Sequence, residues 1–228
     1  MSAVAIITAR GGSKRIPRKN IKPFLGKPML VYSIEAALSS GIFDEVMVST
    51  DDEEIADIAK KAGAKVPFYR SEKTANDFAT TSDVILEVLE EYGKRGQNFD
   101  SFCCIYPTAP FITPERLKEG MELLAEQKPD SVMPVVSFSF PPQRCVIIED
   151  GKLVPKWPEN MPKRSQDLEP YYHDCGQFYC VNAGRFLEEK AILMQNTMPL
   201  LLSELEVQDI DNEVDWKLAE LKYKLLHG

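Results

Sequence analysis

The fold is decided by the stretch at residues 3–20, AVAIITARGGSKRIPRKN. It opens with an uncharged, mostly apolar run of the length of one strand, which is typical of a parallel strand buried on both faces. A loop with adjacent glycines follows, and residues 28–38 then carry Leu30, Ile34 and Leu38 at helical spacing. The order strand, loop, helix is the first unit of an α/β domain.

The same alternation continues along the chain. Further strands are predicted at residues 45–49, 64–69, 101–106, 131–136 and 177–181, and residues 200–202 form another apolar run. Helices are predicted after a cap at Thr50 or Asp51, after a cap among Thr80, Thr81 and Ser82, from Pro114, at residues 183–190 and at residues 212–226. The pattern indicates a doubly wound, mostly parallel α/β sheet, in which ligands bind beyond the carboxyl ends of the strands.

The last predicted helix carries an apolar stripe. Val214, Leu218, Leu221 and Leu225 recur at helical spacing, as they do in a helix that covers a core. We therefore expect these four side chains to face inward.

The alternation breaks at residues 137–170, which contain six prolines. We interpret this segment as an excursion from the sheet within a single domain that spans residues 1–228. Phe138, Phe140 and Trp157 favour a surface for a partner, and a lid over the site is the alternative.

The composition narrows the possible classes of protein. A chain of 228 residues with 44% hydrophobic residues can bury one substantial core, and its net charge of −8 argues against binding to nucleic acid or an anionic membrane. The apolar run at the amino end is too short for a signal peptide or a membrane span, so we expect a cytoplasmic protein. The five cysteines lack a Cys-x-x-Cys spacing and are expected to be reduced, and two histidines leave little material for a histidine metal site.

The charges are unevenly distributed. Seven lysines and arginines, and no acidic residue, lie between residues 10 and 27. Adjacent glycines let a bulky anion approach the backbone and the cations neutralise it, so the loop is predicted to hold a triphosphate. The sequence has neither the Walker A nor the dinucleotide glycine pattern. A solvated basic loop is the alternative, which its place at the end of a strand disfavours.

Acidic residues gather near the carboxyl end. Asp209 and Asp211 are separated by one residue, which places both carboxylates on one side of an extended segment, where they can share a divalent cation such as Mg²⁺. Alternatively, Asp211 or Asn212 caps the final helix. The phosphate-binding prediction for the basic loop favours the metal.

Two motifs together resemble a known family. Residues 9–20, with Ile21-Lys22 and Gly26-Lys27-Pro28, resemble the amino-terminal signature of the CMP-sialic acid synthetases (acylneuraminate cytidylyltransferases). Asp209-Ile210-Asp211 resembles the second part of that signature, and the similarity extends over nearly the whole chain. The resemblance implies a Rossmann-like nucleotidyltransferase fold, CTP as a substrate, and a homodimer in which the excursion at residues 137–170 reaches the neighbouring subunit's site.

Within that family the chain is most similar to the pseudaminic acid cytidylyltransferases. The similarity lies in RIPR at residues 15–18 and in YYHDCGQFY at residues 171–179. Tyr106 stands where the sialic acid synthetases have a glutamine, and His173 and Cys175 stand where an arginine and an asparagine are expected. These exchanges would reshape the sugar pocket, so the resemblance implies pseudaminic acid. Sialic, legionaminic and Kdo acids remain alternatives, as does a non-catalytic nucleotide sensor.

The implied reaction is attack by the anomeric hydroxyl of a nine-carbon keto-sugar acid on the α-phosphate of CTP, with pyrophosphate leaving in line. Arg10 and Lys19 are the expected catalytic cations, and Asp209 and Asp211 are the expected metal ligands. Hydrogen bonds to the phosphates are expected from Gly11, Gly12 and Ser13.

The resemblance also assigns the two substrates to other residues, each of which has an ordinary turn or cap role as its alternative. The cytosine and ribose are expected at Asn20, Arg70, Ala79 and Thr81. The sugar acid is expected at Tyr106, Thr108, Arg144, Arg164, His173, Asp174 and Gln177. Of these, Arg144 or Arg164 would pair with the sugar carboxylate, because a guanidinium group matches a carboxylate in shape and charge.

Overall fold

A central mixed sheet organises the molecule, which a computed structural model describes for residues 2–228. The sheet has seven strands, in the order β11-β6-β10-β5-β1-β4, with β9 beside β6. Their bounds are β1 Ala3–Thr8, β4 Glu45–Ser49, β5 Ser101–Ile105, β6 Ser131–Ser137, β9 Tyr172–Asp174, β10 Phe178–Asn182 and β11 Thr197–Leu201. Strand β1 is parallel to β4 and β5, β11 is parallel to β6, and β10 is antiparallel to both of its neighbours. The predicted doubly wound, mostly parallel sheet is confirmed, with β10 and the short β9 reversed.

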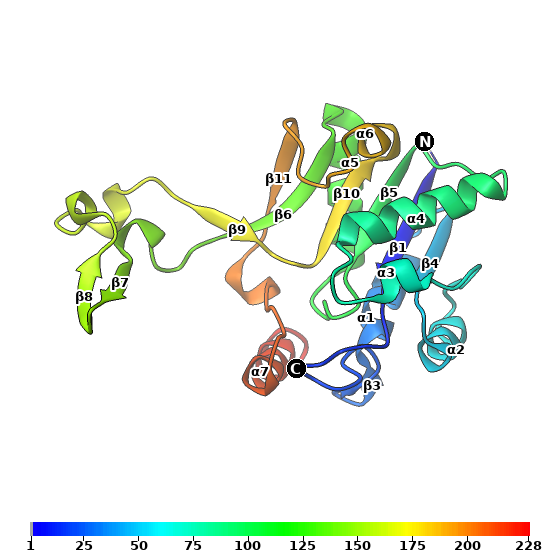
Figure 1. The fold of residues 1–228 in the computed structure, drawn as a ribbon, viewed down its shortest axis with the longest axis horizontal. Helices are drawn as coiled ribbons and strands as arrows, with labels where there is room; N and C mark the ends of the chain where they lie inside the picture. Colours follow the sequence, from blue (N-terminus) through cyan, green and yellow to red (C-terminus); the bar gives the residue numbers. More distant parts are fainter. Residues whose placement is uncertain (1) are drawn as a thin grey trace.

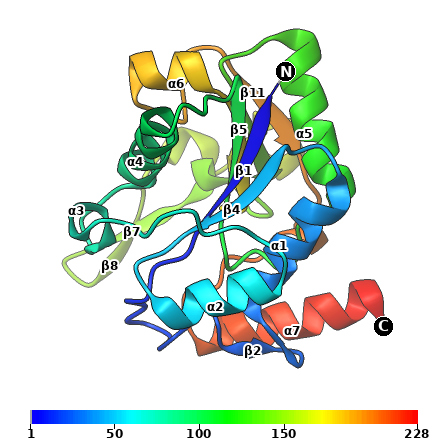
Figure 2. The ribbon, with the colours of Figure 1, turned by 90° about the vertical axis from the view of Figure 1, so that its right-hand side faces the viewer.

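Helices cover both faces of the sheet (Figure 2). They are α1 Met29–Ser40, α2 Glu53–Lys61, α3 Glu72–Ala75, α4 Thr81–Lys94, α5 Pro114–Gln127, α6 Ala183–Glu189 and α7 Glu213–His227. Along β1, Ala5 and Ile7 pack with α1 and α5, whereas Val4 and Ile6 pack with α4 and α6. A strand buried on both faces explains why its sequence is apolar throughout.

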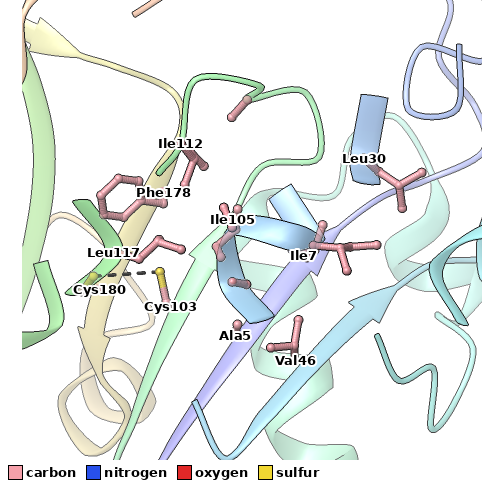
Figure 3. Close-up of a cluster of buried hydrophobic side chains, with 14 of the residues drawn as sticks. Ala5, Ile7, Leu30, Val46, Cys103, Ile105, Ile112, Leu117, Phe178 and Cys180 are labelled. Atoms are coloured by element: carbon pink, nitrogen blue, oxygen red, sulfur yellow. Dashed lines mark hydrogen bonds between the residues drawn. The ribbon is translucent and has the colours of Figure 1, made fainter. Parts of the chain in front are cut away.

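Buried thiols lie in the middle of the sheet (Figure 3). Cys103 and Cys104 are fully buried in β5, as their place in a predicted strand requires. Cys103 lies opposite Cys180 of β10, with the two Sγ atoms 3.9 Å apart, and both are free thiols. Burial raises the pKa of the Cys104 thiol to about 12, so it is expected to be unreactive.

The close packing of α5 on the sheet yields a stability prediction at Gly120. A Cβ there would lie 2.9 Å from Cys180 Sγ and 3.2 Å from the Phe178 ring. Gly120→Ala should therefore lower the free energy of unfolding by about 1–3 kcal/mol, as overpacking a core does. At Gly93 of α4 the nearest atom would be 3.7 Å away, so Gly93→Ala should instead stabilise by about 0.5–1 kcal/mol. Urea unfolding of both variants checks the contrast, and equal changes would show that helix propensity alone is acting.

Two details of the predicted pattern are wrong. Residues 64–69 do not form a strand; they make a single bridge, between Met47 and Lys65, because Pro67 cannot donate a ladder hydrogen bond. The cap of α2 is Asp52 rather than Thr50 or Asp51, since Asp52 Oδ1 accepts a hydrogen bond from the Ile55 N–H at 3.0 Å.

The predicted inner face of α7 is also wrong. Val214, Leu218, Leu221 and Leu225 are all exposed in the chain. The helix turns Trp216 and Ala219 inward instead, and the Trp216 ring meets Phe24 edge to face at 5.6 Å. Phe24 lies on a small hairpin of β2 Pro23–Phe24 and β3 Lys27–Pro28, which the sequence pattern did not predict. The larger aromatic surface thus decides which face is buried.

Residues 138–171, here called the arm, extend away from the sheet (Figure 1). The arm contains a hairpin of β7 Val146–Glu149 and β8 Lys152–Pro155, together with three short 3-10 turns at Pro142–Arg144, Pro158–Asn160 and Ser165–Asp167. Ile148 and Leu153 are opposite each other on the hairpin and are 76% and 71% exposed. A lone two-stranded hairpin is marginally stable in water, so this apolar face favours a partner surface.

Candidate active site

A cationic cavity lies at the carboxyl ends of β1 and β5. It has a volume of about 180 Å³ and is lined by Thr8, Arg10, Ser13, Lys14, Arg15, Ile16, Lys19, Asn20 and Pro107. Four of these residues are cations of the loop after β1, and all four come from one stretch of ten residues. The cavity is therefore suited to a highly charged anion, at the edge of the sheet where α/β folds bind ligands.

Internal contacts fix the course of this loop. Asn20 is buried, and its Nδ2 donates to the Arg10 carbonyl at 2.8 Å, while its own carbonyl accepts from the Leu30 N–H at 2.8 Å. Arg18 has a left-handed backbone and pairs with Asp52 and Glu54 of the α2 amino end. Asn20 thus holds the loop in shape and also lines the cavity, and its expected contact with the nucleoside stays a prediction.

Gly11 has a specific structural requirement. Its N–H donates to Asp51 Oδ1 at 2.9 Å, and a Cβ at this position would lie 2.8 Å from Asp52 Oδ2. The glycine therefore permits close approach of the loop to the start of α2. Its N–H group, expected to donate to a phosphate, is engaged by Asp51 in this structure.

The amino-terminal loop and the carboxyl-terminal acidic segment lie side by side. Lys19 Nζ donates to the Ile210 carbonyl at 2.5 Å and lies 3.7 Å from Asp211 Oδ1, and Arg15 Nη1 lies 2.6 Å from Asp211 Oδ2. The Lys19 side chain is only 18% exposed, and burial lowers its pKa against the opposing effect of the carboxylates. Segments about 190 residues apart in the sequence thus form one site.

The two aspartates have different surroundings. Asp211 faces the loop cations, while Asp209 lines a second cavity of about 390 Å³ together with His173, Asp174 and Lys222. Ile210, between them, is buried and anchors the segment. No cluster of three or more His, Cys, Asp or Glu side chains suited to a metal occurs within residues 2–228. Mg²⁺ commonly takes one or two carboxylates and completes its shell with water and phosphate oxygens, so the oxygen donors of this pair fit that ion.

Three more of the residues expected at the nucleoside are Arg70, Ala79 and Thr81. Arg70 is buried, donates to Ser49 Oγ and the Ser49 carbonyl at 3.1 and 2.9 Å, and has its pKa lowered to about 10 by burial. The Ala79 N–H donates to Asn76 Oδ1 at 3.0 Å, in the turn before α4. Thr81 Oγ1 lies 3.0 Å from Tyr106 Oη, so the expected nucleoside and sugar residues are in contact there.

On the sugar side, Tyr106 is the first of a chain of contacts. Its ring meets Tyr179 edge to face at 5.6 Å, and Tyr179 Oη donates to Asp174 Oδ2 at 2.5 Å. His173 packs against Phe138 at 4.8 Å, at the base of the arm. Thr108 lies in the turn after β5, two residues beyond Tyr106. The structure thus links Tyr106 and Asp174 through Tyr179, which had not been assigned to the site.

Three of the expected sugar residues are placed differently. Gln177 is buried, and its Nε2 donates to the Glu206 carbonyl at 2.5 Å, which is a scaffold contact. Arg144 and Arg164 lie in the arm, where Arg164 pairs with Asp167 at 2.8 Å and Arg144 donates to Ser165 at 3.3 Å. The structure does not bring these arginines together with the other expected residues of the same chain.

Some residues of the cavity were missed at the level of the sequence. Lys14 and Arg15 line it, and their signal was the same cluster of charge that identified Arg10 and Lys19. Asp77 contacts Arg10 and Lys14 from the turn between α3 and α4. A single aspartate in a polar turn carries no sequence signal for such a contact.

Comparison with known proteins identifies the family. A family model described as Cytidylyltransferase matches residues 4–151. A pseudaminic acid cytidylyltransferase from Campylobacter jejuni is 42% identical over 228 residues, covering 100% of this chain and 98% of the relative. A CMP-N,N'-diacetyllegionaminic acid synthase from Legionella pneumophila is 37% identical, covering 96% and 95%.

The fold is similarly matched. A solved CMP:2-keto-3-deoxy-manno-octonic acid synthetase in complex with CTP superposes with a TM-score of 0.69 over 100% of this chain and 99% of that chain, at 19% identity. A likeness at this level of identity concerns the fold. No helix within residues 2–228 has the length and apolar character needed to cross a membrane. The cationic cavity, the sheet and the sequence similarity together show that this chain belongs to the cytidylyltransferase family of nucleotidyltransferases.

Proposed function

We propose that this protein transfers CMP from CTP to the anomeric hydroxyl of pseudaminic acid, a nine-carbon keto-sugar acid, and releases pyrophosphate. The observation that carries the proposal is the contact between the loop cations and Asp211: Arg15 and Lys19 both line the cavity, and both lie within ion-pair distance of this one carboxylate. The substrate rests on the Campylobacter jejuni relative, which is 42% identical over the full chain.

The loop cations stabilise the charge that builds on the phosphates. Arg10, Lys14 and Lys19 line the cavity and would hold the triphosphate, so that the leaving pyrophosphate is neutralised as its bond to the α-phosphate breaks. Among these three cations, Lys19 is expected to stabilise the phosphate charge most, because its side chain is the least exposed and water screens its charge least. The protein needs no covalent intermediate for this transfer.

Asp209 and Asp211 would hold Mg²⁺ next to the loop cations. When bound, the ion would supply positive charge to the phosphates and lower the pKa of a hydroxyl group next to it. Arg15 and Lys19 form ion pairs with Asp211, and these contacts keep the acidic segment against the loop.

The sugar acid would occupy the 390 Å³ cavity between the base of the arm and the acidic segment. His173, Asp174 and Lys222 line that space. Lys222 Nζ is fixed there by the carbonyls of Val207 and Glu204, at 2.8 and 3.2 Å. Its ammonium group adds a cation to a cavity that must accept a carboxylate.

The test is a substrate screen with purified protein, CTP and Mg²⁺. Pseudaminic, sialic, legionaminic and Kdo acids are offered separately, and pyrophosphate release is measured for each. The proposal requires the highest kcat/KM for pseudaminic acid. A preference for legionaminic acid would move the substrate to that of the Legionella relative, and no turnover with any sugar acid would support a nucleotide sensor.

The arm is proposed to join two copies of the chain into a homodimer, with Arg144 or Arg164 reaching the sugar carboxylate in the partner's site. The exposed apolar face of the β7–β8 hairpin supports this role. Ile148→Glu should convert the dimer to monomers in sedimentation experiments, because it would bury a charge without a partner. Lys152→Glu introduces the same side chain on the opposite face of the hairpin and should leave the dimer intact. Monomeric wild-type protein would contradict the dimer.

A further inference from the structure

Two cations of the loop share one carboxylate from another part of the chain. Arg10 Nη1 lies 2.6 Å from Asp77 Oδ1, and Lys14 Nζ forms a hydrogen bond with Asp77 Oδ2. Arg10 and Lys14 both line the 180 Å³ cavity. An anion that enters the cavity therefore meets two cations that already have an acceptor.

The turn that carries Asp77 is held on one side. Asn76 Oδ1 accepts from the N–H groups of Phe78 and Ala79 at 2.8 and 3.0 Å, and Asn76 Nδ2 donates to the Lys73 carbonyl at 2.7 Å. These contacts fix the turn next to the Asp77 carboxylate without fixing the carboxylate itself. Arg10 and Asp77 remain 35% and 37% exposed, so water reaches the pair and exchange of its partners is easy.

We propose that Asp77 is an internal competitor for the nucleotide phosphates and thereby sets the affinity of the site for CTP and pyrophosphate. It neutralises Arg10 and Lys14 in the nucleotide-free protein and is exchanged for phosphate oxygens when the nucleotide binds. Guanidinium and ammonium groups bind carboxylate and phosphate oxygens through the same charge-assisted hydrogen bonds, and a diphosphate can replace both contacts at once.

The exchange has a second consequence for the nucleoside side of the site. Asp77 is two residues from Ala79, which is expected at the nucleoside together with Thr81. Release of Asp77 removes the ion pairs that tie the turn between α3 and α4 to the cationic loop when phosphate occupies the cavity. The inference rests on the proposed CTP site but not on the identity of the sugar acid.

A simple tether would act in the opposite direction. If Asp77 only held Arg10 and Lys14 in place for the phosphates, its removal would weaken phosphate binding. As a competitor, its removal strengthens binding. The sign of the change in affinity therefore separates the two roles.

The experiment is calorimetric titration of the full chain and of Asp77→Asn with pyrophosphate, CTP and cytidine, in the presence of a metal chelator. Each exposed ion pair contributes little, so we expect the Kd for pyrophosphate and for CTP to fall about three- to tenfold in Asp77→Asn. Cytidine has no phosphate, so its Kd should not change. The difference should shrink as the salt concentration rises, because salt screens exposed charges.

Three further variants complete the experiment. Asp77→Ala should repeat the gain, which excludes a new hydrogen bond from the asparagine amide, and Asp77→Glu should restore the wild-type Kd. Glu54→Gln removes an ion pair from the same loop, but at Arg18, which points to α2, so phosphate affinity should not change. Unchanged or weaker pyrophosphate binding in folded Asp77→Asn and Asp77→Ala would overturn the proposal. Because these titrations need no sugar acid, their outcome is independent of the substrate screen.

Discussion

Lys19→Met is expected to lower kcat by about 10²- to 10³-fold, the loss typical of removing one preorganised donor to a developing charge. The Lys19 ammonium is the least exposed of the cations for which the site shows an ion pair, at 18%, and it lies between the loop and the acidic segment. Its field in the cavity is screened less by water than that of Arg15 or Lys14. Pyrophosphate release under saturating substrates measures the effect.

The matched control for this substitution is Lys22→Met. Lys22 also joins the two ends of the chain, through Glu213 at 2.7 Å, and it lies over the Trp216 ring, beside the cavity rather than in its lining. We expect kcat to change less than about threefold, as for other exposed ion pairs. An equal loss of activity in both variants would mean that Lys19 acts by holding the segments together.

Asp211→Asn is expected to raise the Mg²⁺ concentration for half-maximal rate by at least about 10- to 100-fold, because changes to residues that only contact a metal ligand already have effects of that size. The amide keeps the shape of the side chain but loses the charge that Mg²⁺ requires. Helix α7 should remain intact, because its cap is Asn212, whose Oδ1 accepts from the N–H groups of Val214 and Asp215. The measurement is a Mg²⁺ titration of the rate at fixed CTP and sugar acid.

Glu213→Gln is the control for the aspartate. Glu213 forms an ion pair with Lys22 and does not line the cavity. The substitution therefore removes one negative charge, as Asp211→Asn does, but two residues further along the chain. Its Mg²⁺ dependence should match that of the wild type. Full activity of Asp211→Asn at low Mg²⁺ would remove the metal assignment, and thermal unfolding of both variants shows whether either change disturbs the fold.

The order of strands and helices could be predicted because each buried strand leaves a continuous apolar run. Ala3–Thr8 and Ser101–Ile105 are buried on both faces, so their sequences carry the signal directly. Residues 64–69 carried a similar signal and failed, because a proline in an edge segment limits pairing to one bridge. The prediction of the inner face of α7 was wrong for another reason. The face of the helix that carries Trp216 packs against Phe24, and this aromatic contact buries that face in place of the apolar stripe.

The candidate site was predictable to the extent that its chemistry is local. A short stretch of sequence, from Arg10 to Lys19, contains enough cations to predict an anion site. The pair Asp209 and Asp211 likewise predicts a metal site. The sequence could not show which residues face the cavity and which support it, because that depends on contacts between distant parts of the chain. Gln177 is buried and donates its side-chain amide to a backbone carbonyl, and Asn20 makes the same kind of contact while also lining the cavity.

The sequence by itself determined the alternation of strands and helices, the charge of the loop and the family, because these depend on residue type and spacing along the chain. The tertiary structure alone decided that Lys19 meets Asp211, that Asp77 contacts Arg10 and Lys14, and that the arm leaves the sheet with an apolar face exposed. These contacts join residues from 63 to about 190 positions apart, and such pairs are fixed by the packing of whole elements rather than by local preference.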